Sequence, residues 1–76
     1  MTRLTLYGRA YCHLCEEMAL ALRARGVAFD EVDVDSDPGL EARWGELVPV
    51  LAGVDGREIC HYRLDPAALE RALGVK

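Results

Sequence analysis

Two cysteines with two residues between them, Cys12 and Cys15, lie where a strand pattern gives way to a helix pattern. Residues 4–7 alternate briefly and end at Gly8, which predicts a short strand. Residues 12–25 carry apolar side chains at helical spacing, so a helix is expected to follow at once. At the start of a helix, two thiols at this spacing lie about one turn apart and can close a small ring on oxidation. The chain is therefore expected to place a pair of thiols at a strand-to-helix junction.

The helix expected over residues 12–25 has one apolar face and one polar face. At 100° per residue, a single arc holds the apolar side chains Leu14, Cys15, Met18, Ala19, Ala21 and Leu22. Gly26 follows at the position where a glycine commonly ends a helix. Leu20 falls on the polar side, and the helical pattern gives no reason for it.

A second strand and a short helix are expected next. Residues 27–34 are rich in valine and predict the strand. Asp37 and Pro38 then form a helix N-cap followed by proline in the first turn, which predicts a helix that runs to about Trp44. Leu40 and Trp44, four residues apart, are expected to form its buried face.

A β-hairpin is expected in the second half of the chain. The segments 49–52 and 57–60 have strand composition and flank the dipeptide Asp55-Gly56. Asp-Gly favours the two positive φ angles of a type I′ turn, which is a common hairpin connection.

Asp65 and Pro66 repeat the signature of a cap followed by proline and open a last helix. Leu69 and Leu73 are expected to face inward, and Gly74 to end the helix. The order of elements along the chain is then β-α-β-α-β-β-α.

This order predicts the sheet. The first two strands are joined through a helix, and such a connection most simply gives parallel strands with a right-handed crossover. The hairpin adds two mutually antiparallel strands, so the expected fold class is α/β, with a mixed four-stranded sheet and helices on its faces. A chain of 76 residues buries only about 60% of its unfolded surface. That is enough for one core, and residues 1–76 are expected to form a single domain.

Charge and composition exclude several classes of function. Nine basic residues against thirteen acidic ones give a net charge of −4, which argues against binding nucleic acid or an anionic membrane through bulk charge. No apolar run reaches the roughly 18 residues that a membrane span needs, and the N-terminus shows no signal-peptide pattern. Three cysteines are too few for a disulfide-stapled secreted domain, so a cytoplasmic, reducing location is expected. A monomer is also expected.

The acidic residues are concentrated in one stretch. Residues 30–41 contain no basic residue and six acidic ones, namely Asp30, Glu31, Asp33, Asp35, Asp37 and Glu41. The stretch partly mimics a calcium-binding loop, but Pro38 and Trp44 stand where that loop needs its glycine and its bidentate glutamate. A solvated acidic edge, which also discourages edge-to-edge aggregation, is the expected structure.

Cys12 is expected at the N-cap of the first helix, with its sulfur directed at the unpaired amides of the first turn. These amides and the helix dipole favour the thiolate and lower the pKa of the thiol. Cys15 lies one turn further in, on the apolar face, where poorer solvation keeps its pKa higher. This asymmetry predicts that Cys12 attacks a disulfide and that Cys15 resolves the resulting mixed disulfide.

Two other uses of the pair remain open. The pair could bind zinc or copper, with further ligands sought among His13, Cys60 and His61. Adjacent side chains on a strand, such as Cys60 and His61, point to opposite faces, which weighs against a shared site. The domain could also be a non-catalytic adaptor that uses large apolar side chains, namely Leu20, Trp44 and Tyr62. Cys60 itself is expected to be a structural or merely tolerated thiol rather than a regulatory site.

Residues 4–15, from the first strand through the Cys-His-Leu-Cys motif, resemble the first strand and dithiol loop of the glutaredoxin-like branch of the thioredoxin superfamily. Val48-Pro49-Val50 resembles the cis-proline segment of that family. The chain is especially similar to short bacterial glutaredoxin-like proteins with a CxxC active site. The resemblance implies a thioredoxin-like, glutaredoxin-type fold, a thiol–disulfide oxidoreductase, and a cis peptide bond at Val48–Pro49 that faces the two cysteines.

The resemblance also implies a substrate-binding set around the dithiol. Arg9 stands where glutaredoxins commonly carry a basic residue, and it could lower the pKa of the first cysteine or receive a carboxylate of glutathione. Tyr11 matches the aromatic residue before the nucleophile, and His13 adds a titratable positive charge beside it. The backbone of Val48, next to Pro49, would pair with the main chain of a substrate.

No bound cofactor is expected, and the implied partner is a disulfide-containing protein or a mixed disulfide of glutathione. Glutathione is also a candidate electron donor. Residues 59–65 lack the paired glycines with which many glutaredoxins hold glutathione, and Leu47 stands in place of their usual threonine. Whether glutathione or another thiol reduces the protein therefore stays open.

Overall fold

The computed structural model describes residues 3–74, and its helices and strands follow the expected order, with one short 3-10 helix added after the second strand. The elements are β1 (Leu4–Gly8), α1 (His13–Ala24), β2 (Phe29–Asp33), η1 (Val34–Ser36), α2 (Pro38–Trp44), β3 (Val50–Ala52), β4 (Glu58–His61) and α3 (Pro66–Leu73). Within the described residues, no helix is both long and apolar enough to cross a membrane.

The four strands form one mixed sheet in the order β2-β1-β3-β4. β1 and β2 run parallel, with Leu4 opposite Phe29 and Gly8 opposite Asp33. β3 lies antiparallel to both β1 and β4. The α/β fold class, the parallel first pair of strands and the antiparallel hairpin predicted from the sequence are therefore confirmed.

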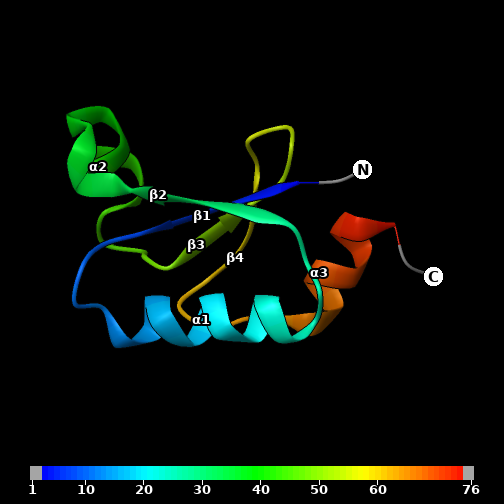
Figure 1. The fold of residues 1–76 in the computed structure, drawn as a ribbon. Helices are drawn as coiled ribbons and strands as arrows, with labels where there is room; N and C mark the ends of the chain where they lie inside the picture. Colours follow the sequence, from blue (N-terminus) through cyan, green and yellow to red (C-terminus); the bar gives the residue numbers. More distant parts are fainter. Residues whose placement is uncertain (1–2, 75–76) are drawn as a thin grey trace.

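The alternation of side chains along the strands divides the core into two clusters. The larger cluster lies between the sheet and the helices α1 and α3, and its buried members are Leu4, Leu6, Met18, Ala19, Leu22, Leu51, Cys60 and Leu69. The smaller cluster lies against α2, and its buried members are Val34, Trp44 and Val50, with Tyr7 packed against them. Figure 1 shows α1 and α3 below the sheet and α2 at its opposite side. β1 contributes to both clusters because successive strand residues point to opposite faces.

The helix ends predicted from local signals are confirmed. The Asp37 carboxylate caps α2 by accepting a hydrogen bond from the Gly39 amide at 2.8 Å. The Asp65 carboxylate caps α3 by accepting one from the Ala68 amide at 3.2 Å. Gly74 ends α3 in the left-handed region, with φ 76°. Each of these ends follows from residues next to it in the sequence, which is why short-range patterns predict them.

The second strand is shorter than the expected 27–34. β2 ends at Asp33, and Val34 begins η1. The Asp33 carboxylate accepts a hydrogen bond from the Asp35 amide at 2.8 Å, and its carbonyl accepts one from the Ser36 hydroxyl at 2.6 Å. An aspartate that bonds to the neighbouring backbone in this way competes with strand pairing, so the chain turns before Val34.

The hairpin between β3 and β4 has a different turn from the one predicted. Gly56 has φ 80°, but Asp55 lies outside the positive-φ region that a type I′ turn requires. The loop spans three residues instead: the Gly53 amide donates to the Arg57 carbonyl at 2.9 Å, and the Gly56 amide donates to the Gly53 carbonyl at 3.0 Å. The Asp55 carboxylate accepts a hydrogen bond from the Arg57 amide at 3.0 Å, which favours this longer loop. The predicted hairpin is confirmed, and the predicted turn type was wrong.

Candidate active site

All four strands begin or finish at the same end of the sheet. Gly8 lies opposite Asp33, where β1 and β2 both end. Tyr7 lies opposite Val50 at the start of β3, and Val50 lies opposite His61 at the end of β4. The loop that leads to the two cysteines, the segment before β3 and the segment after β4 therefore leave the sheet close to one another.

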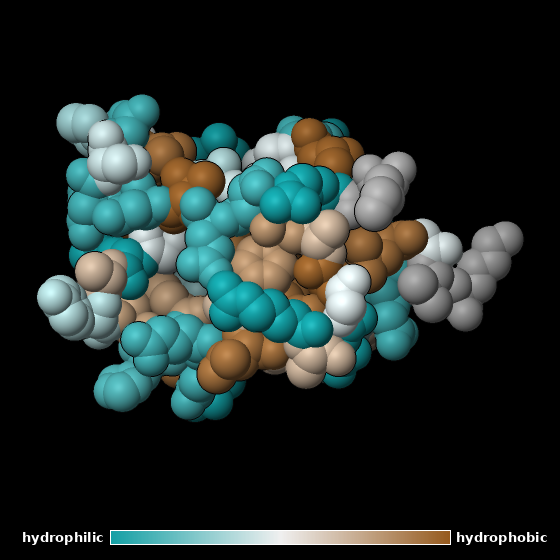
Figure 2. Space-filling model, viewed as in Figure 1, coloured by the Kyte–Doolittle hydropathy of each residue, from teal (hydrophilic) through white to brown (hydrophobic). Residues whose placement is uncertain are grey.

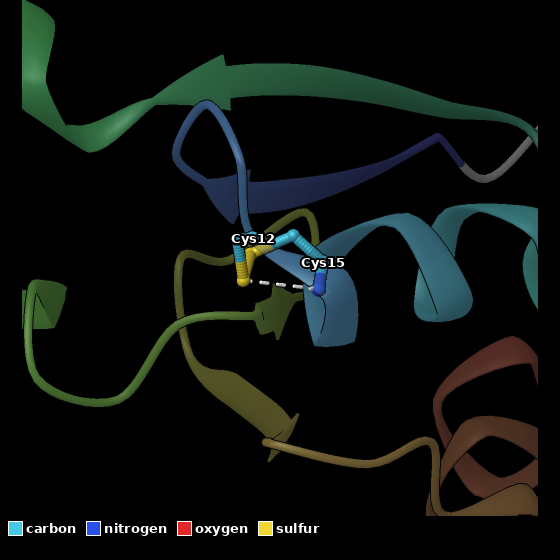
Figure 3. The surroundings of a disulfide bond; sticks show 2 residues. All are labelled: Cys12 and Cys15. Carbon is cyan, nitrogen blue, oxygen red and sulfur yellow. Dashed lines mark hydrogen bonds between the residues drawn. A yellow bond between two sulfur atoms is a disulfide. The ribbon is translucent and has the colours of Figure 1, made fainter.

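Cys12 and Cys15 form a disulfide at this end of the sheet, with their Cα atoms 5.2 Å apart. Cys12 is the N-cap of α1, and its sulfur accepts a hydrogen bond from the Cys15 amide at 3.1 Å (Figure 3). A sulfur thus takes the capping position that serine, threonine, aspartate or asparagine fills in most helices. The expected placement, with one sulfur at the helix N-terminus and its partner one turn further in, is confirmed.

The two cysteines differ in their surroundings. Cys15 is buried, with 8% of its surface exposed, whereas Cys12 is half-buried. Gly8 lies directly against Cys15, because a Cβ atom built at position 8 would lie 3.1 Å from the Cys15 sulfur. A molecule that approaches from solvent therefore reaches Cys12 before it reaches Cys15.

The peptide bond between Val48 and Pro49 is cis, as the resemblance implied. Pro49 is buried, and its carbonyl accepts a hydrogen bond from the Tyr62 amide at 2.9 Å. Val48 is half-buried and packs against the smaller core cluster. In Figure 3 the segment that enters β3 passes the end of α1 that carries the disulfide, in keeping with the pairing of β1 and β3.

Arg9 lies beside two carboxylates of the segment that follows β2. Its Nη2 atom lies 3.5 Å from the carboxylate of Asp35 on η1 and 3.5 Å from that of Glu41 on α2. Its Nε and Nη2 atoms are buried without a hydrogen-bond partner among the described residues. Arg9 therefore ties the loop before Cys12 to η1 and α2, and these two carboxylates offset much of its positive charge.

Tyr11 and His13 flank Cys12 and are exposed, Tyr11 completely so. Tyr11 has φ 60°, a left-handed conformation that residues other than glycine rarely adopt. His13 is the first residue of α1. Both side chains are accessible to a molecule that approaches Cys12.

Tyr62 also lies at this end of the sheet, although no motif in the sequence links it to the dithiol. It follows β4 with φ 65°, its amide bonds to Pro49, and its hydroxyl donates to the Glu46 carbonyl at 3.1 Å. Its ring meets the ring of His61 edge-on, with the centroids 4.6 Å apart. No local pattern could place Tyr62 here, because the pairing of β3 with β4 brings it beside Pro49.

The residues considered as metal ligands are not brought together. Among residues 3–74, no three His, Cys, Asp or Glu side chains form a group that could hold a metal ion. Cys60 belongs to the larger core cluster, and the Nδ1 atom of His61 lies 2.7 Å from the Glu58 carboxylate. Of the contacts named for an adaptor, Trp44 is buried, whereas Leu20 and Tyr62 are exposed.

Cys60 is a free cysteine and is 8% exposed. Burial raises the pKa of its thiol; a hydrogen bond from the Asp65 backbone acts in the opposite direction, and the carboxylates of Asp65 and Glu58 add smaller upward contributions. Because the folded pKa exceeds the unfolded one, the thiol contributes stability below the unfolded pKa and loses that contribution as the pH rises through the folded pKa. The fold therefore favours the protonated thiol at Cys60.

We therefore expect iodoacetamide at pH 8 to alkylate Cys60 at least about tenfold more slowly in the folded protein than in the unfolded chain. Mass spectrometry of the Cys12→Ser/Cys15→Ser variant, which retains Cys60 as its sole cysteine, measures both rates. The same variant in about 8 M urea, which unfolds most small domains, gives the rate for the unfolded chain and is the control. Equal rates in the two states would contradict a buried, structural thiol.

A protein-family model described as glutaredoxin-like domain (DUF836) matches residues 3–74. No curated protein matches the chain.

Solved structures of similar proteins share the fold. Protein XcR50 from X. campestris is 43% identical, with a TM-score of 0.77 over 93% of this chain and 95% of that one. Protein Ne2328 from Nitrosomonas europaea is 35% identical, with a TM-score of 0.78 over 96% of this chain and 87% of that one. A variant of the thioredoxin-like protein BC3987 is 21% identical, with a TM-score of 0.69 over the full length of both chains. The last similarity extends to the fold alone, which is thioredoxin-like.

Proposed function

The chain belongs to the glutaredoxin-like domain (DUF836) family, and from this premise we propose that it is a thiol–disulfide oxidoreductase whose reactive groups are Cys12 and Cys15. One observation carries the proposal: the Cys12 sulfur caps α1 and accepts the Cys15 amide while it is bonded to the Cys15 sulfur. After reduction, the same amide and the helix dipole favour a thiolate at Cys12. A pair that can be closed into a disulfide and reopened at an accessible sulfur suits two-electron exchange.

The reaction has two thiol–disulfide exchanges. The Cys12 thiolate attacks one sulfur of the substrate disulfide, a bond forms between Cys12 and that sulfur, and the other substrate sulfur leaves as a thiolate that takes a proton from water. Cys15 then loses its proton and attacks the Cys12 sulfur. The Cys12–Cys15 bond forms, and the second substrate sulfur leaves and is protonated. The substrate gains two electrons and two protons, and the dithiol becomes a disulfide.

The flanking residues have supporting roles in this proposal. Tyr11 and His13, both exposed beside Cys12, contact the bound substrate. The backbone at Val48, next to the cis Pro49, pairs with the substrate main chain. Arg9 holds the loop before Cys12 through its two carboxylate partners. The Arg9 side chain is 34% exposed, and in this proposal its charge also attracts a carboxylate of the substrate or of glutathione.

A thiol donor must return two electrons to the Cys12–Cys15 disulfide after each turnover. Two molecules of glutathione, or one dithiol of a thioredoxin-type reductase, balance this step. The donor is a co-substrate, so the reaction needs no resident cofactor. A reducing, cytoplasmic location would keep such donors available, and the chain can perform the exchange as a monomer because both thiols lie on one helix end.

The test is a turnover assay on 2-hydroxyethyl disulfide, run once with glutathione and glutathione reductase and once with a thioredoxin-type reductase system. We expect turnover with at least one donor and loss of two thiols, without dimer formation, when the reduced protein is oxidised. The faster donor identifies the reductant. No turnover with either donor, together with stoichiometric zinc or copper in protein purified under reducing conditions, would favour a metal-binding module instead.

A further inference from the structure

A groove of about 660 Å³ runs between α1 and the edge strand β2. Cys15 and Gly8 line it near the dithiol, and Leu20 and Arg23 line it further along α1. Figure 1 shows α1 and β2 at the front of the molecule, and Figure 2, from the same side, shows apolar surface between them with hydrophilic residues along its borders. The groove thus leads away from the inner cysteine along the side of the first helix.

The groove accounts for the leucine that the helical pattern left unexplained. Leu20 lies on the side of α1 that faces solvent and is 64% exposed. It lines the groove together with Ala19 of α1 and Val32 of β2. An apolar side chain inserted here would cover Leu20 and remove further apolar surface from water, worth about 25 cal/mol for each Å².

The groove is lined by three acidic and two basic residues. Arg23 pairs with Glu31 across it, and Arg9 pairs with carboxylates on η1 and α2, so both basic residues of the lining are engaged. The other two acidic residues of the lining, Glu16 and Asp33, have no ion-pair partner among the described residues.

The wall formed by β2 is also the start of the acidic stretch 30–41, which holds six of the thirteen acidic residues of the chain. All six of these side chains are exposed. In the rest of the chain, seven acidic residues are outnumbered by nine basic ones. The β2 wall of the groove therefore carries part of this acidic stretch, whereas Glu41 lies on α2 at the opposite side of the sheet.

We infer that this groove docks the disulfide-bearing protein substrate through a basic segment with one apolar anchor residue. The inference rests on the proposed function, because it assigns a substrate class to that same dithiol. The apolar anchor lies against Leu20 and Val32, and lysine or arginine residues beside it face Glu16 and Asp33. A second copy of this chain is a poorer occupant, since each copy carries a net charge of −4 and the two would repel one another.

The length of the groove along α1 predicts how many residues separate the anchor from the substrate cysteine. From Cys12, which bonds to the substrate cysteine, to Leu20, which contacts the anchor, the distance along α1 is eight residues, or about 12 Å at 1.5 Å per residue. An extended chain covers about 3.3 Å per residue. The anchor is therefore expected three or four residues from the substrate cysteine.

The test uses a pair of synthetic peptides that carry a cysteine as a mixed disulfide with 2-nitro-5-thiobenzoate, and a leucine four residues before it. One peptide has lysine on both sides of the leucine and the other has glutamate. We expect kcat/KM to be about tenfold higher for the lysine peptide. Leu20→Gln removes the apolar contact, and Glu31→Lys leaves Arg23 unpaired and adds a positive charge to the groove. Each should remove about fivefold or more of this advantage through KM, with turnover of 2-hydroxyethyl disulfide unchanged. Val54→Gln, at an exposed apolar residue of the hairpin loop, and Glu70→Lys, on α3, are the matched controls.

Binding is measured separately from chemistry. The oxidised wild-type protein is titrated with the lysine peptide in which serine replaces cysteine, and amide shifts are followed by NMR. We expect the shifts to centre on Ala19, Leu20 and Val32. Such shifts without turnover on any disulfide would overturn the oxidoreductase and leave the docking surface standing. Equal kcat/KM for the two peptides would overturn the docking surface. So would peptide-induced shifts centred on Tyr62 instead of Leu20. Shifts at Leu20 that follow the protein concentration without added peptide would show that a second copy of the chain occupies the groove, and would also overturn it.

Discussion

Cys12→Ser is expected to lose disulfide reduction by about a thousandfold or more, because a serine hydroxyl is not ionised near neutral pH and cannot form a mixed disulfide. Cys15→Ser is expected to complete the first exchange and stop there, because Cys12 still attacks and nothing resolves the product. Mass spectrometry after incubation with 2-hydroxyethyl disulfide measures the outcome. Cys15→Ser should gain the mass of one substrate thiol, and Cys12→Ser should gain none.

Cys60→Ala is the matched control, since it removes a cysteine from the larger core cluster and leaves the dithiol intact. It should retain turnover and form no adduct. A stable adduct on Cys15 in the Cys12→Ser variant would reverse the assigned roles. If both serine variants fold, as judged by circular dichroism, and neither loses turnover, the dithiol mechanism is wrong.

The second large effect is expected on stability. Trp44→Ala should lower the free energy of unfolding by about 3–5 kcal/mol, the usual cost of truncating a buried aromatic side chain. Trp44 is 6% exposed and stacks on Tyr7 with the ring centroids 5.7 Å apart. Among the described residues, the other buried members of the smaller core cluster are Val34 and Val50, and their side chains are too small to fill the space that the indole would leave. Urea denaturation followed by circular dichroism measures the change.

Arg43→Ala is the matched control for this prediction. Its guanidinium lies over the Trp44 ring, 4.3 Å from the centroid, on the exposed side of the helix. Loss of an exposed cation–π contact should cost only about 0.5–1 kcal/mol. If Trp44→Ala cost no more than Arg43→Ala, the smaller cluster would not be a stabilising part of the core.

The sequence was sufficient for the helix caps, which depend on neighbours along the chain. The caps at Asp37 and Asp65 use side chains that bond to amides two or three residues away. The placement of Cys12 at the N-cap of α1 has the same origin, since its sulfur bonds to an amide three residues on. The periodicity of α1 also identified four buried residues, namely Cys15, Met18, Ala19 and Leu22.

Short-range patterns failed where two local preferences competed. Asp55-Gly56 fits a two-residue type I′ turn, but the Asp55 carboxylate bonds to the Arg57 amide and the loop spans three residues. Val34 continues the strand pattern of residues 27–34, but Asp33 turns the chain before it. In both places, an aspartate that bonds to nearby backbone prevailed over the simpler pattern.

The amino-acid order by itself determined the order of the elements, the helix caps and the pair of sulfurs at the N-terminus of the first helix, because each depends on contacts within a few residues. Only the tertiary structure decided which partners surround that pair. The pairing of β3 with β4 brought Tyr62 to Pro49, ion pairs with η1 and α2 drew Arg9 toward carboxylates, and α1 beside β2 formed the groove at Leu20. These neighbours are far apart in the chain, and contacts between distant segments are set by the packing of the whole core, which no local pattern encodes.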